Sequence, residues 1–265
     1  MIAHGFASDL KQVAALSANA GSDMDMESTA YIQHLKSLVE TGKVSMAVVD
    51  DAVKRILRVK FLLGLFDDPY KYCDAKREKE LLYHPDHLAA ALDVAKKSIV
   101  LLKNENQLLP LDKNQKNIAI IGALAGDKTS PLGSWRIGSD DSTAVSVVDG
   151  IQKINTQTSY VKGVNLVIGK PDFINEVMIN ETDTSGYAAA ISAARKAEVV
   201  VMVLGEHGFQ SGEGRSRTEL GLPGLQQRLL EEVYKVNKNI VLVLMNGRPL
   251  ALPWAADNIP AILET

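Results

Sequence analysis

The segment "EVVVMVLG", residues 198–205, is the strongest indication of the fold. It is an unbroken, valine-rich apolar run without the apolar–polar alternation of a half-exposed strand, so we expect a strand that is buried on both faces. A second run, "NIVLVLMNG" at 239–247, has the same character, and shorter ones lie at 117–124, 159–164 and 260–265. Strands of this kind are typical of parallel sheets covered by helices.

Helical patterns separate these strands. Segments 143–154, 185–197 and 222–237 are helix candidates, and Pro223 suits the first turn of the last one. The alternation of buried strand and helix predicts a twisted, mostly parallel α/β sheet for residues 88–265.

The N-terminal part has a different, mainly helical pattern. Helices are expected at 8–21 and 28–43, and Ser45 is the expected N-cap of a third helix that ends at Gly64. A polar stretch at 67–87, interrupted by prolines, is typical of a linker with a little helix. We therefore expect three parts: residues 1–66, a linker at 67–87 and an α/β domain at 88–265.

The bulk composition excludes several classes of protein. Of the 265 residues, 46% are hydrophobic and 23% are charged, which is ordinary for a globular protein. The formal net charge of −3 argues against a nucleic-acid-binding or anionic-membrane surface, and no apolar run approaches the roughly 20 residues that span a bilayer. The single cysteine, Cys73, has no partner for an internal disulfide.

Several common catalytic motifs are also missing. The sequence contains no G-x-x-x-x-G-K-[ST], H-E-x-x-H or G-x-S-x-G, so nucleotide hydrolysis, zinc proteolysis and esterase chemistry have no support. No G-x-G-x-x-G turn follows the strand at 117–124, which disfavours a Rossmann-like nucleotide binder. His84 and His87 lack further clustered ligands, so we expect no metal site.

The loop "GEHGFQSGEGRSRTELGLPG", residues 205–224, is the candidate functional segment. Ligands of open parallel sheets bind beyond the carboxyl ends of the strands, which is where this loop begins. Glu213 stands between two glycines that permit tight turns, and Arg215 and Arg217 follow it. A solvated loop with incidental charges is the alternative to a functional one.

Many segments, in order along the chain, resemble the second domain of glycoside hydrolase family 3, of the bacterial β-glucosidase type. They are "LLKNENQLLPL" (101–111), "IAIIG" (118–122), "GSW" (133–135), "VVMVLGE" (200–206), "SGEGRSRTELGLPGLQQRLL" (211–230) and "IVLVLMNGRPLAL" (240–252). The segments "HGFASD" (4–9), "AALSANAGSDMDM" (14–26) and "LVETGKVSMAVVDDAVKRILRVKFLLGLFDDPY" (38–70) resemble the end of that family's catalytic (β/α)8 barrel.

The resemblance implies both a fold and site residues. The fold would be a mainly helical (β/α)8-barrel remnant followed by an α/β sandwich domain, truncated at its end, with a mostly parallel sheet. Glu213 matches the family's acid/base, which the second domain delivers to the open face of the barrel. Arg215 and Arg217 would orient the loop or hold sugar hydroxyls, and Asp23 would contact the substrate near the last barrel strand.

Some of these residues have alternative roles. For Asp23, Asp25 and Glu27 the alternative is capping of the helix that follows. Trp135 suits a core or interface aromatic as well as a sugar platform. The turn at 246–248 either braces the same crevice or is a plain turn.

Retaining glycosidases need a second carboxyl group, about 5–5.5 Å from the first, that attacks the anomeric carbon. In the family this aspartate lies in a Ser-Asp-Trp/His-Gly element shortly before the position of His4, so we expect it upstream of Met1 and absent from this chain. The longer enzyme would cleave terminal β-D-glucosyl or related β-glycosyl linkages without a cofactor, whereas this chain alone would be inactive. A non-catalytic α/β carbohydrate-binding or interaction module on the same scaffold is the alternative.

The expected partner is an oligosaccharide or β-glucoside, and neither nucleic acid nor a membrane is expected. The sequence leaves open whether the longer enzyme forms a homodimer. The N-terminus shows no signal-peptide pattern, so localisation is undetermined, although a periplasmic or secreted longer enzyme fits the resemblance. We also expect the helices of residues 1–66 to expose apolar faces that the rest of a barrel would cover.

Overall fold

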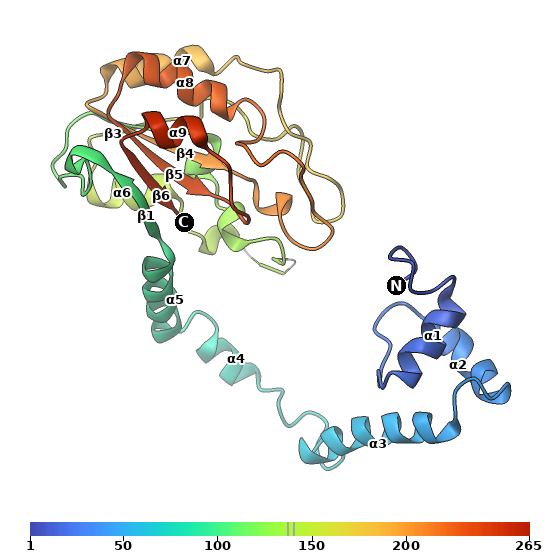
Figure 1. Cartoon of the computed structure of the whole chain (residues 1–265). Coiled ribbons are helices and arrows are strands. Elements are labelled where there is room, and N and C mark those ends of the chain that lie inside the picture. Colours follow the sequence, from blue (N-terminus) through green and yellow to red (C-terminus); the bar gives the residue numbers. More distant parts are fainter. Residues whose placement is uncertain (137, 140) are drawn as a thin grey trace. The chain divides into compact units, whose positions relative to one another are not determined.

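The structure, a computed structural model, describes residues 1–136, 138–139 and 141–265. The chain divides into two compact units, Met1–His87 and Leu88–Thr265. Figure 1 shows both units and labels most of their helices and strands. Across the described residues, no helix is both long enough and apolar enough to cross a bilayer.

The second unit is built on a six-stranded sheet with the order β1-β6-β5-β4-β2-β3. The strands are β1 (Val100–Asn104), β2 (Ile118–Ile121), β3 (Thr158–Val161), β4 (Val199–Gly205), β5 (Ile240–Met245) and β6 (Ala261–Glu264). Strands β2 to β6 pair in parallel, and only β1 runs antiparallel to its neighbour β6. The predicted α/β fold with a mostly parallel sheet is therefore confirmed.

Helices cover both faces of this sheet, which explains the missing alternation in β4 and β5. On one face, α7 (Tyr187–Lys196), α8 (Gln226–Val236) and α9 (Pro253–Asn258) pack on alternate strand residues such as Met202 and Leu242. On the other face, α6 (Val147–Ile154) packs on the intervening ones. Every residue of β4 is buried. Figure 1 shows α7, α8 and α9 grouped together over the sheet.

The helix α5 (Pro85–Ser98) ends just before the apolar segment that forms the edge strand β1. One prediction about local structure needs correction. Pro223 does not start α8, which begins at Gln226. Gly224 precedes that helix with φ +61°, and a Cβ there would lie 2.4 Å from the carbonyl oxygen of Asn180, so the chain makes a left-handed turn before helix geometry can begin.

Short 3-10 turns connect several of these elements. They are η1 (Glu105–Gln107), η2 (Ala123–Gly126), η3 (Ser130–Leu132), η4 (Asp141–Thr143) and η5 (Gly208–Gln210). The turns η2 and η5 begin within three residues of the ends of β2 and β4, so the carboxyl ends of these two neighbouring central strands lead into tightly folded loops.

The first unit is mainly helical, as the sequence predicts. Its helices are α1 (Leu10–Asn19), α2 (Ala30–Glu40), α3 (Met46–Leu62) and α4 (Ala75–Leu81). Ser45 caps α3 by accepting the N–H of Val48 at 3.3 Å, as expected. The unit has a small core around Ala14 and Leu38, whereas α3 has no buried residue and leaves Leu62 81% exposed. The expected exposure of apolar helix faces is confirmed for α3.

Candidate functional site

The loop between β4 and α8 starts at the carboxyl edge of the sheet, in the middle of the strand order, because β4 lies between β2 and β5. The loops that follow β2, β4 and β5 share this edge, since the three strands are parallel. This is the edge at which open α/β sheets place their ligands.

A buried ion cluster holds the base of the loop. Glu206 follows β4 directly, and its side chain is only 1% exposed. Its carboxylate accepts an N–H of Arg217 at 2.7 Å and the Nε–H of Arg248 at 3.2 Å. Arg217 also donates to the carbonyl of Gly221 at 2.9 Å, and Arg248 donates to the carbonyl of Gln210. One carboxylate therefore joins both ends of the loop to the turn after β5.

A buried amide reinforces the same base. Gln226, the first residue of α8, accepts the N–H of Gly205 at 3.0 Å and donates to the carbonyl of Gly205 at 2.7 Å and to that of Pro223 at 3.0 Å. The start of α8 is thereby tied to the last residue of β4, and the two ends of the loop are held together.

The first part of the loop folds into the turn η5. The Nδ1 of His207 accepts the N–H of Phe209 at 3.2 Å, and the backbone N–H of His207 donates to the side chain of Gln210 at 2.8 Å. Gly208 donates its N–H to the Oγ of Ser130 at 2.9 Å, which ties η5 to the loop after β2. Burial lowers the pKa of His207, so the neutral imidazole is favoured here.

The tip of the loop has the opposite character. Glu213 is exposed, and it forms no hydrogen bond or ion pair with any residue of the described part of the chain. Its neighbours Gly212 and Gly214 have φ of +114° and +71°, a region that favours glycine. A Cβ on Gly212 would lie 2.5 Å from the Oγ of Ser134, so the tip also packs closely against the loop after β2. The result is a free carboxylate on a fixed base.

The two predicted arginines contact protein groups. Arg217 is held by Glu206 and Gly221, which fits the first of its two predicted roles, orienting the loop. Arg215 is half-buried and donates from one Nη to the carbonyl of Phe173 at 2.6 Å, which links the loop to the segment before α7. The other N–H groups of its guanidinium have no hydrogen-bond partner in the described part of the chain.

Trp135 lies on the neighbouring loop and is 62% exposed. Its ring centroid is 5.2 Å from that of Phe173, whose carbonyl accepts from Arg215. The aromatic ring is therefore packed on one side and open on the other.

Asp23 belongs to the first unit, and Arg55 binds both of its carboxylate oxygens, with N–O distances of 2.6 to 2.9 Å. The hydrogen bond from Arg55 lowers the pKa of Asp23. Asp25 accepts the N–H of Tyr31 at 3.0 Å at the start of α2, so the capping alternative holds for Asp25, whereas Asp23 forms an ion pair instead.

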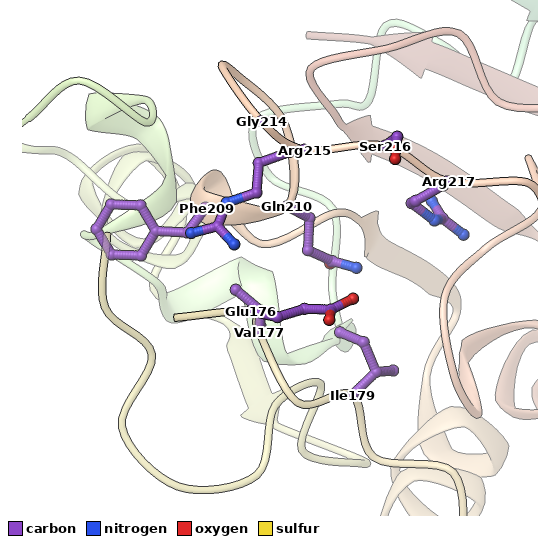
Figure 2. A pocket seen from close by; sticks show the side chains of 9 residues that line it. All are labelled: Glu176, Val177, Ile179, Phe209, Gln210, Gly214, Arg215, Ser216 and Arg217. Carbon is purple, nitrogen blue, oxygen red and sulfur yellow. The ribbon is translucent and has the colours of Figure 1, made fainter. Parts of the chain in front are cut away.

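A polar cavity of about 390 Å³ opens beside the loop. One wall is the loop itself, from Gly214 to Arg217, and another is the segment Glu176–Ile179. Figure 2 shows the amide end of Gln210 and the carboxylate of Glu176 reaching toward the same part of the cavity. Glu213 does not line it, although its neighbour Gly214 does.

Sequence reasoning missed the residues that fix the loop. Glu206 and Gln226 are the buried polar groups at its base, and neither was singled out. A charged residue directly after a fully apolar strand is a signal that could have found Glu206, whereas the pairing of Gln226 with Gly205 depends on how α8 packs. In the part of the chain that the structure describes, no three His, Cys, Asp or Glu side chains gather as metal ligands would.

Comparison with known proteins shows the family. Residues 99–265 match the glycosyl hydrolase family 3 C-terminal domain. The chain is 37% identical over its whole length to a periplasmic β-glucosidase of Salmonella typhimurium, and 35% identical over 99% of its length to a β-xylosidase of Formosa agariphila. It spans only 36% of each of these relatives.

A solved structure gives the same result. The crystal structure of a β-glucosidase from Listeria innocua in complex with glucose superimposes with a TM-score of 0.84 at 34% identity, covering 99% of this chain and 34% of that one. With its fold, the sequence pattern of its loop and its similarity to these relatives in agreement, the chain belongs to glycosyl hydrolase family 3 and carries the C-terminal domain of that family.

Proposed function

We propose that the chain is part of a longer retaining glycoside hydrolase that cleaves terminal β-D-glucosyl or related β-glycosyl linkages, with Glu213 as its general acid and base. The names of the relatives support the substrate class, since they are a β-glucosidase and a β-xylosidase, and the Listeria innocua enzyme is in complex with glucose. Residues 1–66 would then be the end of a (β/α)8 barrel, 67–87 a linker and 88–265 the α/β sandwich.

The observation that carries the proposal is the contrast within one loop. Its base is held by the buried cluster of Glu206 with Arg217 and Arg248, while Glu213 at the tip is exposed between two glycines. A carboxyl group that must reach a substrate bound largely by another part of the protein needs a loop with a fixed base and an exposed tip. A loop that only closes the fold needs neither.

The chemistry requires two carboxyl groups. In the first step a carboxylate, which the longer protein would supply, attacks the anomeric carbon, and Glu213 protonates the departing glycosidic oxygen as the C–O bond breaks. In the second step Glu213, now ionised, removes a proton from the water that attacks the glycosyl ester, and this restores both groups. No cofactor takes part in either step.

The remaining predicted residues have supporting roles in this proposal. Arg217 orients the loop through Glu206. Arg215 holds the loop to Phe173, and the other N–H groups of its guanidinium are available to sugar hydroxyls. Asp23, paired with Arg55, would contact the sugar from the barrel end.

The test uses an enzyme of the relatives' length that contains this chain. Replacing Glu213 by Gln should lower kcat/KM for an alkyl β-glucoside by about 10²–10⁴-fold, because the leaving oxygen must be protonated. Turnover of a dinitrophenyl β-glucoside, whose leaving group needs no acid, should be recovered by azide with formation of β-glucosyl azide. Failure of azide to form this product would reject Glu213 as the acid/base. The 265-residue chain alone should not turn over either substrate.

The alternative is a non-catalytic carbohydrate-binding or interaction module on the same scaffold. It predicts that the long protein does not hydrolyse β-glycosides at all and that Glu213→Gln changes nothing. The periplasmic relative supports export of the longer protein, which fractionation of cells that express it would test.

A further inference from the structure

We propose that the cavity beside the loop, bounded by Gln210, Gly214–Arg217 and Glu176–Ile179, is a binding site for a neutral pyranose, separate from the reacting carboxyl groups. Glu213 does not line this cavity, so the proposal does not depend on the function assigned to that residue.

Hydrogen bonds within the protein hold the walls of the cavity in place. Residues 166–180 form a small antiparallel pair, in which Ile168 donates to the carbonyl of Met178 at 2.9 Å and Asn180 donates to that of Leu166 at 3.0 Å. The carboxylate of Asp172 accepts the N–H of Asn175 at 2.7 Å and closes the turn at the end of this pair. The hairpin therefore needs little reorganisation to bind a ligand, which favours affinity.

The opposite wall is fixed as well. Arg217 is anchored on Glu206, and Arg215 spans the gap to the carbonyl of Phe173 at 2.6 Å, which joins the loop to the hairpin at one end of the cavity. Gln210 is anchored through its Oε1, which accepts the N–H of His207 at 2.8 Å, so its Nε2 group is left to face the cavity.

The polar groups without protein partners suit hydroxyl groups. The Nε2 of Gln210 offers two donors, the carboxylate of Glu176 offers only acceptors, and Ser216 offers both. None of these three groups has a hydrogen-bond partner in the described part of the chain. Figure 2 shows the Gln210 amide and the Glu176 carboxylate converging, and a pair of adjacent sugar hydroxyls can accept from the first while donating to the second.

The charges select a neutral ligand. The guanidinium of Arg217 is paired with Glu206, a carboxylate that Arg248 shares, and the charges of Arg215 and Glu176 oppose each other in the lining of the cavity. An anionic ligand would be attracted by Arg215 but repelled by Glu176, and a cationic ligand would be attracted by Glu176 but repelled by Arg215.

The cavity also has an apolar part and a suitable size. Among the apolar side chains of the lining, Val177 and Phe209 are nearly buried, so the half-buried Ile179 leaves most of the apolar surface that a C–H face of a sugar ring can cover. A volume of about 390 Å³ lies within the range of roughly 300–1,000 Å³ that is usual for small-molecule sites.

The test is an NMR titration of the ¹⁵N-labelled 265-residue chain with cellobiose. We expect saturable shifts of the amides of Gly214, Arg215 and Ser216 and of the side-chain NH₂ of Gln210, with a Kd on the order of 1–10 mM. Glu176→Ala, which removes an exposed and unpaired carboxylate, should weaken binding by about tenfold. The matched control is Asp257→Ala, an exposed acid on α9 that does not line the cavity; this change should leave binding unaltered.

Three results would overturn the proposal: no saturable shift of these amides, binding that Glu176→Ala does not weaken, or tighter binding of glucuronate than of cellobiose. Because the measurement is of binding to a chain that is expected to be inactive, its failure would leave the role of Glu213 untouched. If Glu213 were not the acid/base, the proposal of a pyranose site in this cavity would be unaffected.

Discussion

The carboxylate of Glu206 lies 2.7 Å from the guanidinium of Arg217, eleven residues further along the same loop, and is almost completely buried. This pair closes the loop on itself at its base, and Glu213 lies between the two residues at the exposed tip. The exposed position of Glu213 is therefore a consequence of a buried contact that the residue itself does not make.

Replacing Glu206 by Ala should lower the free energy of unfolding by about 3 kcal/mol, because two partly buried arginines lose their common carboxylate. Glu206→Gln should have a smaller effect, since the amide oxygen still accepts one N–H. Urea denaturation measures both. Glu213→Gln is the matched control and should stay within about 0.5 kcal/mol of the unmodified chain. Equal effects of Glu206→Ala and Glu213→Gln would contradict the assigned role of the cluster.

Replacing Gln226 by Ala should destabilise the chain by about 2–4 kcal/mol, because the buried N–H and carbonyl of Gly205 lose their partners. Among the described residues, the side chain of the neighbouring Gln227 bonds only to Glu231 within the same helix, so Gln227→Ala should cost less than about 0.5 kcal/mol. Chemical denaturation of the two variants gives the comparison. If they behave alike, Gln226 does not hold the loop.

The two glycines beside Glu213 should respond differently to substitution by Ala. At Gly212 a Cβ would meet Ser134 at 2.5 Å with φ at +114°, and we expect a loss of about 2–4 kcal/mol. A Cβ at Gly214 would have no described atom within 4 Å. The expected loss of stability there is therefore only the strain of an Ala in the left-handed region, about 1 kcal/mol. Thermal unfolding measures this order, and the reverse order would show that the tip does not pack on Ser134.

Stability should fall as pH drops below about 6.5, in part through His207. Burial lowers the pKa of His207 in the folded chain, so the unfolded chain takes up the proton first as pH falls, and the stabilising contribution present above that pH is lost. Glu264 acts in the opposite direction, because burial raises its pKa.

The difference between the unmodified chain and His207→Asn isolates the histidine, since Glu264 contributes equally to both. We expect this difference in unfolding free energy, measured between pH 5 and 8, to shrink toward acid. A difference that does not change with pH would mean that His207 keeps an ordinary pKa.

Limited proteolysis should cut the first unit before the second. The first unit has one small core, and α3 contributes no buried residue to it, whereas two large apolar clusters cover the faces of the sheet in the second unit. Mass spectrometry of the early fragments should show cleavage within residues 1–87 while 99–265 stays intact. Uniform resistance along the chain would contradict this.

The sheet and its helices could be predicted from the sequence because their signals are local. The apolar runs of β4 and β5 have no alternation, since both of their faces are covered, and the helical pattern is visible between them. The edge strand β1 could not be identified, because its antiparallel pairing with β6 joins segments about 160 residues apart. The family resemblance, carried by ordered motifs over most of the chain, is confirmed.

The sequence by itself determined that Glu213 stands between two glycines in a loop at the carboxyl edge of a parallel sheet. Only the tertiary structure decided which group each of the two arginines binds, since Arg217 and Arg215 look alike in the sequence. The buried carboxylate of Glu206 selects Arg217, and the carbonyl of Phe173 selects Arg215. The physical reason is that desolvated charges must find partners wherever the fold brings them together, and those distances are set by the packing of strands and loops that are remote in sequence.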